Sequence, residues 1–80
     1  MEHKHYFYVV RCVDHTYYAG YTNDLSRRIR MHNEGKGAKY TRGRRPVTSI
    51  YYETYDTNRR AMQQEYAFKQ LTRLQKEQYM

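Results

Sequence analysis

An arginine and a histidine lie on the side of a predicted helix where apolar residues are expected. Within DLSRRIRMHN, the i, i+3, i+4, i+7 stripe of a helix consists of Leu25, Arg28, Ile29 and His32. Such a stripe faces the core, so Arg28 and His32 are predicted to point inward. An arginine there can stabilise developing negative charge, and a histidine can transfer protons. The alternative is that both lie at the edge of the stripe and extend into solvent.

A glutamate interrupts the apolar arc of a later predicted helix in the same way. Glu65 lies on one arc with Ala61, Phe68 and Leu71. A carboxylate near an apolar interface is costly unless it is paired or binds a cation. Glu65 is therefore predicted either to pair with Arg28 or to bind a metal such as Mg²⁺, which one or two carboxylates commonly hold. These groups, with a tyrosine-rich hairpin before them, are what phosphodiester hydrolysis needs.

Strands and helices with the order β-β-α-β-α-α are predicted to position these groups. Strand-like segments rich in β-branched and aromatic residues span 5–12, 16–21 and 47–55. The first two are separated by a short turn and form a hairpin. The sheet should therefore be at least partly antiparallel, with helices packed against it, in an α+β fold. Eighty residues are predicted to form a single domain over 1–80.

Capping residues delimit the predicted helices. Asn23, with Asp24 beside it, is the predicted N-cap of the first, and Thr72 with Gln75 forms a capping box before the last. The helices are expected at 25 to about 35, from a cap at 56 or 57 to about 71, and from 73 to the end. The intervening segment 35–46, rich in glycine and positive charge, is predicted to be a long loop.

The positive charge of the chain is concentrated in one segment. Residues 27–45 carry eight Lys or Arg against one acid, which accounts for the whole net charge of +7. Such a patch attracts polyanions, with nucleic acid the usual partner, although it also suits a solvated surface. No apolar run approaches the roughly 20 residues that span a bilayer, and no signal peptide is evident, which predicts a cytoplasmic protein without a membrane partner. The single cysteine, Cys12, is predicted to be buried in a strand.

Three motifs and one glutamate span nearly the whole chain: YFYVV at 6–10, YAG at 18–20, LSRRIRMH at 25–32, and Glu65. Together they resemble the GIY-YIG nuclease domain. The segment GKGAKYTRGRRPV is similar to the loop of the short, stand-alone bacterial members, whose biological role is largely uncharacterised. Tyr6 and Ala19 depart from the motif, standing where the family has glycine and isoleucine. The resemblance implies a three-stranded antiparallel sheet flanked by helices and a nuclease site with one divalent metal, usually Mg²⁺ and alternatively Mn²⁺.

The resemblance also implies catalytic roles for five residues. Tyr8 matches the proposed general base that activates the attacking water, and Tyr18 matches the tyrosine that helps to position water and phosphate. Arg28 matches the arginine that stabilises the transition state. His32 matches a histidine proposed to assist proton transfer or to orient the tyrosine. Glu65 matches the lone carboxylate that binds the metal.

The two tyrosines place a condition on the hairpin. Side chains alternate along a strand, so a strict two-residue turn would put Tyr8 and Tyr18 on opposite faces. A three-residue loop or a bulge puts them on the same face, and we predict that arrangement. His15 is suited to the left-handed conformation that such loops use.

The leading hypothesis is a metal-dependent endonuclease that hydrolyses phosphodiester bonds in DNA, or in particular DNA structures, in repair or processing. Tyr40 is expected either to stack on an exposed base or to pin its loop to the core. Selection of substrate would come from the basic loop, from a homodimer or from a targeting partner protein. The alternatives are a non-catalytic module that binds DNA or structured RNA, and an adaptor for an acidic protein. The predicted phosphate contacts are Lys36, Lys39, Arg42, Arg44 and Arg45.

Overall fold

The central strand of an antiparallel sheet carries four consecutive core residues, 7–10, in the computed structural model, which describes residues 4–80. These residues form three strands in the order β2-β1-β3. The strands are β1 (His5–Arg11), β2 (Tyr17–Thr22) and β3 (Thr48–Tyr55). Phe7 and Val9 face one core cluster, and Tyr8 and Val10 face the other. The predicted α+β class and the three-stranded antiparallel sheet are confirmed.

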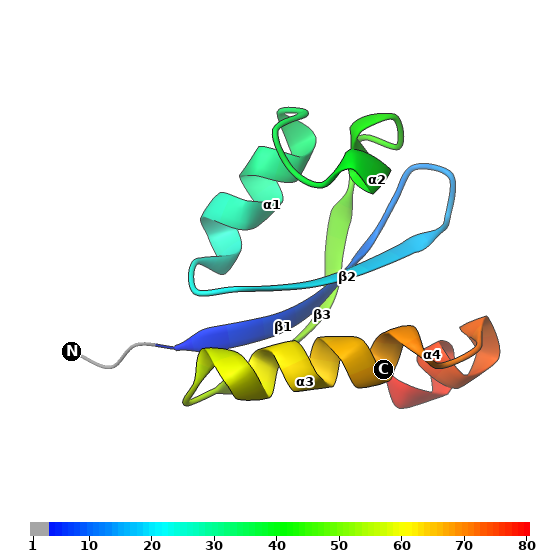
Figure 1. Ribbon diagram of the computed structural model, residues 1–80. Coiled ribbons are helices and arrows are strands. Elements are labelled where there is room, and N and C mark those ends of the chain that lie inside the picture. The colour runs from blue at the N-terminus through cyan, green and yellow to red at the C-terminus, as the bar shows by residue number, and fades with distance from the viewer. Residues whose placement is uncertain (1–3) are drawn as a thin grey trace.

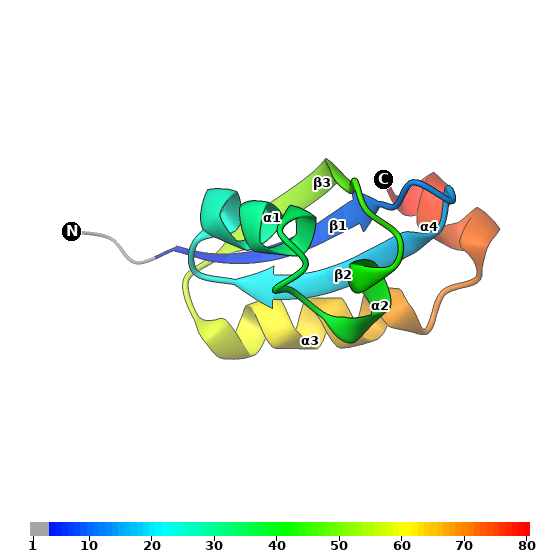
Figure 2. The ribbon, with the colours of Figure 1, turned by 90° about the horizontal axis from the view of Figure 1, so that it is seen from above.

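Helices cover both faces of this sheet. The helices within residues 4–80 are α1 (Leu25–Asn33), α2 (Lys39–Arg42), α3 (Asn58–Lys69) and α4 (Arg73–Tyr79). The short α1 and α2 lie on one face, and α3 and α4 lie on the other (Figure 1). Seen from above, α1 and α2 lie side by side over the sheet (Figure 2). None of these helices is long and apolar enough to cross a membrane.

The β1–β2 hairpin places Tyr8 and Tyr18 on the same face, as predicted. Val10 is paired directly with Tyr18, and Tyr8 with Gly20. Paired residues project to the same face, and so do residues two apart along a strand. The Cys12 amide donates to the Thr16 carbonyl at 2.8 Å, which leaves a three-residue loop at 13–15. The backbone of His15 adopts the left-handed conformation within this loop, with φ at 67°.

Two predicted local features differ from the structure. The N-cap of α1 is Asp24, not Asn23: its carboxylate accepts from the Arg27 amide at 3.2 Å. The hydroxyl of Thr22, at the end of β2, accepts from the Asp24 amide and so places that residue at the first turn. The segment 35–46 is not entirely loop, because it contains α2. The capping box of Thr72 and Gln75 is confirmed.

The C-terminal end of α1 is clamped to the start of β3. The Asn33 side chain accepts from the Val47 amide at 2.7 Å and donates to the Val47 carbonyl at 3.1 Å. The N-terminal end of α1 is held by its short connection to β2. The helix is therefore fixed at both ends. The inner stripe of α1 is therefore fixed over the face of the sheet that carries Tyr8.

Candidate active site

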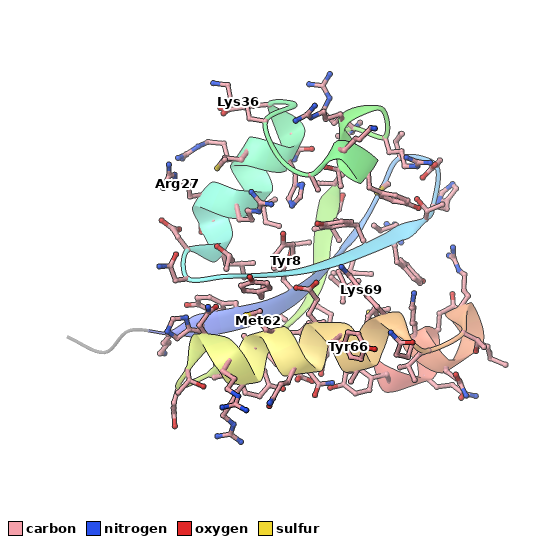
Figure 3. The ribbon with its side chains drawn as sticks, in the orientation of Figure 1. Tyr8, Arg27, Lys36, Met62, Tyr66 and Lys69 are labelled. Atoms are coloured by element: carbon pink, nitrogen blue, oxygen red, sulfur yellow. The ribbon has the colours of Figure 1, made fainter. Side chains whose placement is uncertain are left out.

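A cleft of about 280 Å³ opens where α1, α3 and the edge strand β2 meet. Its lining is formed by Tyr8, Tyr18, Gly20, Tyr21, Arg28 and Glu65. Four of the five residues with implied catalytic roles thus line one cleft. The fifth, His32, lies directly behind Tyr8. Figure 3 shows Tyr8 between α1 and α3.

The Tyr8 hydroxyl occupies the centre of the site. Tyr8 is fully buried, and Arg28 donates from Nε to its hydroxyl at 3.4 Å. Gly20 makes room for this hydroxyl, because a Cβ at that position would lie 2.5 Å from it. Burial raises the pKa of Tyr8 to about 12, although Arg28 acts in the opposite direction. Tyr8 is therefore a neutral phenol at neutral pH.

His32 is buried behind Tyr8 and contacts a hydroxyl at each ring nitrogen. Nε2 lies 2.8 Å from the Tyr8 oxygen, and Nδ1 lies 2.8 Å from Oγ1 of Thr41. Burial, and after it the positive charge of Arg28, lowers the pKa of His32 to about 4. The prediction that Arg28 and His32 point inward is confirmed, and His32 does not extend into solvent. Thr41 gave no signal in the sequence, because only the fold places it against a residue nine positions away.

The buried imidazole predicts an acid-sensitive fold. The pKa of His32 falls from 6.5 to about 4 on folding, so the unfolded chain binds the extra proton between these values. The free energy of unfolding should therefore fall, by about 3 kcal/mol, as the pH drops from about 6.5 to 4. Denaturant melts across this range should show the fall in the wild type. The His32→Gln protein should lack this component, and parallel pH profiles for the two proteins would contradict the prediction.

Glu65 reaches the cleft from α3 and pairs with Lys69 rather than with Arg28. Its Oε1 lies 2.7 Å from Nζ of Lys69, and the Glu65 side chain is only 16% exposed. The predicted Glu65–Arg28 ion pair is therefore not formed, since Lys69 one turn along α3 is closer at hand. Lys69 also lies with Nζ 5.6 Å from the centre of the Tyr18 ring. Its i+4 spacing from Glu65 is the sequence signal that identifies it.

Tyr40 closes the site on the α2 side. Its ring stacks on that of Tyr18, with centroids 5.9 Å apart and planes at 24°. The guanidinium carbon of Arg44 lies 4.0 Å from the centre of the same ring. Because the ring already has two partners within the protein, the geometry favours the predicted pinning role. Stacking of Tyr40 on a nucleic-acid base stays a prediction and would require one of these contacts to open.

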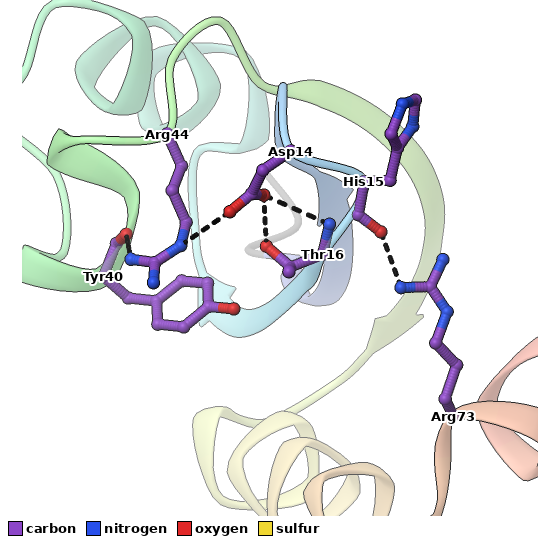
Figure 4. A network of polar contacts seen from close by, with 6 residues as sticks. All are labelled: Asp14, His15, Thr16, Tyr40, Arg44 and Arg73. Atoms are coloured by element: carbon purple, nitrogen blue, oxygen red, sulfur yellow. Dashed lines mark hydrogen bonds and ion pairs between the residues drawn. The ribbon is translucent and has the colours of Figure 1, made fainter.

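The five basic residues of the 35–46 segment divide into two groups. Arg44 donates to the Asp14 carboxylate and to the Tyr40 carbonyl, which ties α2 to the β1–β2 hairpin (Figure 4). Arg45 donates to the carbonyls of residues 42 and 33. Both arginines thus hold the segment in place. Within residues 4–80 the other three, Lys36, Lys39 and Arg42, are exposed and their side chains make no hydrogen bond or ion pair.

Comparison with protein families identifies the arrangement. Residues 4–78 match the model of the GIY-YIG catalytic domain. The chain belongs to the GIY-YIG family. This GIY-YIG chain is 62% identical over 77 residues to a UPF0213 protein of Bacillus velezensis, covering 96% of the chain and 78% of that relative. It is 60% identical over 77 residues to the UPF0213 protein YazA of Bacillus subtilis, with the same coverage of both chains.

Two solution NMR structures resemble this GIY-YIG domain. A UPF0213 protein from Bacillus halodurans is 46% identical, with a TM-score of 0.62, over 95% of this chain and 81% of the other. A protein from E. faecalis is 53% identical, with a TM-score of 0.65, over 99% of this chain and 86% of the other. Membership of the family implies interaction with nucleic acid in general terms.

The two departures from the GIY-YIG motif lie away from the cleft. Tyr6 packs edge-on against Tyr52, with ring centroids 6.0 Å apart. Ala19 is buried in the cluster that faces α3, together with Phe7. Neither side chain lines the cleft. Both substitutions therefore alter packing and leave the cleft residues in place.

The donor atoms of this site suit a magnesium ion better than a zinc ion. Within the described part of the chain, no three His, Cys, Asp or Glu side chains gather as a metal site. Zinc sites in proteins use at least three such ligands, whereas Mg²⁺ is often held by one or two carboxylates, with water and phosphate oxygens completing the shell. Glu65 supplies one carboxylate beside Arg28 in a solvent-accessible cleft. The residues present therefore fit a magnesium ion held by one carboxylate, with other oxygen ligands completing its shell.

Proposed function

We propose that this GIY-YIG domain is a divalent-metal-dependent endonuclease that hydrolyses phosphodiester bonds in DNA, in repair or processing. One observation carries the proposal. The Tyr8 hydroxyl is held between Arg28 and His32 in a cleft that Glu65 also lines. A proton acceptor, a fixed positive charge and a carboxylate are thus brought together within a cleft of about 280 Å³.

Arg28 supplies the fixed positive charge. Its contact with the Tyr8 hydroxyl raises the pKa of Arg28 above the ordinary value, so the guanidinium stays charged. It lines the cleft and is half-buried, which limits screening by water. A phosphodiester gains negative charge on its oxygens as water attacks, and a preorganised guanidinium stabilises that charge.

Tyr8 and His32 together take up the proton of the attacking water. A phenol whose pKa is about 12 is not ionised to phenolate at neutral pH. The Tyr8 oxygen can accept a proton from water while its own proton passes to Nε2 of His32, which lies 2.8 Å away. The low pKa of His32 makes this transfer temporary, so the proton is returned when the reaction is complete.

Glu65 is the residue that would hold the divalent metal. When bound, Mg²⁺ or Mn²⁺ would polarise the phosphate and neutralise charge on the leaving oxygen. In the free protein the Lys69 ammonium lies against this carboxylate and stabilises its charge. Tyr18, whose ring lies between Tyr40 and the cleft, forms the wall against which water and phosphate are positioned.

A cleavage assay tests the proposal. Plasmid, branched DNA and structured RNA are incubated with the protein in Mg²⁺, in Mn²⁺ and in EDTA. Cleavage of DNA that EDTA abolishes is the expected result. Salt-sensitive binding without cleavage in any metal would contradict the proposal and support the non-catalytic module, which the exposed basic residues near α2 would also serve.

The exposed basic residues of the 35–46 segment should set the affinity for DNA. Lys36→Ala, Lys39→Ala and Arg42→Ala, combined in one protein, are expected to weaken binding to all sequences alike. Each lost phosphate contact should reduce the slope of log K against log salt by about 0.9. Fluorescence anisotropy at several salt concentrations measures both effects. A loss confined to one DNA sequence would contradict this prediction.

A second triple variant controls for net charge alone. Lys4→Ala, Arg11→Ala and Arg59→Ala remove the same three charges from exposed positions outside this segment. Binding should change much less in this control.

Arg44→Ala is expected to lower the melting temperature, because the Arg44 guanidinium donates to the Asp14 carboxylate and to the Tyr40 carbonyl.

A further inference from the structure

Thr41 is a fully buried polar residue placed beside the proposed proton acceptor. It lies on α2, and its Oγ1 is 2.8 Å from Nδ1 of His32. The Thr41 hydroxyl also donates to the Ala38 carbonyl at 2.9 Å. Tyr8, His32, Thr41 and the Ala38 carbonyl therefore form one buried chain of hydrogen bonds that begins in the cleft.

The Ala38 carbonyl, at the end of this hydrogen-bond chain, determines where the protons of the chain lie. A carbonyl only accepts, so the single hydroxyl hydrogen of Thr41 must lie between its oxygen and Ala38. The same oxygen then accepts from His32, which requires the proton on Nδ1. A neutral imidazole carries one N–H, so Nε2 is unprotonated and accepts from the Tyr8 hydroxyl. The opposite tautomer would turn the Thr41 hydrogen away from Ala38 and leave two oxygens facing each other.

The backbone of Gly37 closes this arrangement from outside. A Cβ at Gly37 would collide with Nδ1 and with the ring carbon next to it. The polypeptide backbone can therefore pass directly over the His32 ring only because residue 37 is a glycine and has no side chain. The backbone at Gly37 therefore occupies the space beside Nδ1 on this side of the ring.

We propose that Thr41 is a positioning residue, which holds His32 as the Nδ1–H tautomer so that Nε2 is free to receive the Tyr8 proton. The effect on cleavage rests on the function proposed above. The tautomer itself does not, since it follows from the hydrogen-bond chain in the free protein. Thr41 touches neither the cleft nor a substrate and acts only through His32.

The test is nitrogen-15 NMR of the His32 ring in the free protein at neutral pH. In the wild type, Nδ1 should have the shift of a protonated nitrogen and Nε2 that of an unprotonated one. Thr41→Val keeps the shape and removes the hydroxyl, so it should move the population toward the Nε2–H tautomer. Thr41→Ser keeps the hydroxyl and should retain the wild-type pattern. Thr54→Val, an exposed position on β3, controls for the substitution.

Cleavage and binding of DNA are measured on the same proteins. Thr41→Val should lower the cleavage rate by about 10–100-fold, with affinity for DNA unchanged, and Thr41→Ser should restore most of the rate. A wild-type proton on Nε2, or an unchanged tautomer in Thr41→Val, would overturn the inference. If Thr41→Val does not fold, the wild-type and Thr41→Ser spectra decide. Absence of cleavage in the wild type would overturn the nuclease proposal but leave the tautomer test intact.

Discussion

Glu65→Gln is expected to lower metal-dependent cleavage of DNA by about a thousandfold or more. Glu65 is the one acidic side chain among the residues described as lining the cleft. The amide keeps the shape of the side chain but loses the negative charge that would bind Mg²⁺. Stabilisation of the transition state by a metal contributes several kcal/mol, and each 1.4 kcal/mol corresponds to about tenfold in rate. Single-turnover cleavage with excess protein measures the chemical step directly.

The same substitution should leave the fold nearly unchanged. Glu65 loses its pair with Lys69, but the Lys69 side chain is 45% exposed and can be solvated. Pairs of this i, i+4 type contribute only about 0.3–0.5 kcal/mol, so the melting temperature should shift by a few degrees at most. Glu34→Gln, at an exposed position after α1, provides the matched control and should cleave normally. Full cleavage by Glu65→Gln would show that Glu65 does not hold the metal.

Tyr8→Phe is expected to lower the cleavage rate by about 10²–10⁴-fold, with little effect on affinity for DNA. The substitution removes the oxygen that contacts both Arg28 and His32 and that is proposed to accept the proton of water. General acid–base groups typically contribute rate factors of this size. The basic residues proposed to bind DNA lie elsewhere, so anisotropy should give a similar dissociation constant. A rate near that of the wild type would show that another group activates the water.

Stability must be measured beside activity for Tyr8→Phe. Loss of the hydroxyl leaves the buried Nε2 of His32 without its partner, which costs about 1–3 kcal/mol. Tyr52→Phe is the matched control, because Tyr52 pairs with Tyr8 across β1 and β3 but is 55% exposed. Tyr52→Phe should retain both the rate and the melting temperature. A folded Tyr8→Phe protein that binds but does not cleave is the result that identifies Tyr8 with the chemistry.

These two variants also distinguish the competing functions. If the wild type binds DNA but does not cleave it in Mg²⁺ or in Mn²⁺, the two substitutions cannot lower a cleavage rate. This result would favour the non-catalytic module. If the wild type cleaves and both variants stop cleaving while still folded, the cleft is the active site. The two residues lie on different elements, β1 and α3, so a local folding defect at one of them would not account for the loss of cleavage in both variants.

The sequence determined the features that depend on neighbours within one turn or one strand. The helical period placed Arg28 and His32 on the inner stripe of α1, and the burial of His32 confirms it. The alternation of strand residues required a three-residue hairpin loop or a bulge for Tyr8 and Tyr18 to share a face, and His15 forms the left-handed residue of the observed loop. Such features follow from local geometry. Side chains repeat every 3.6 residues in a helix and every two residues in a strand, wherever the element lies in the fold.

Only the tertiary structure decided which partners meet across the chain. It stacked Tyr40 on Tyr18 and brought Thr41 against His32. It also formed α2 inside a segment whose glycines and charges predict a loop. These outcomes depend on the distances and angles at which separate segments pack, and no local period encodes them. The sequence therefore determined which residues face the site, and the fold alone determined how their protons and charges are connected.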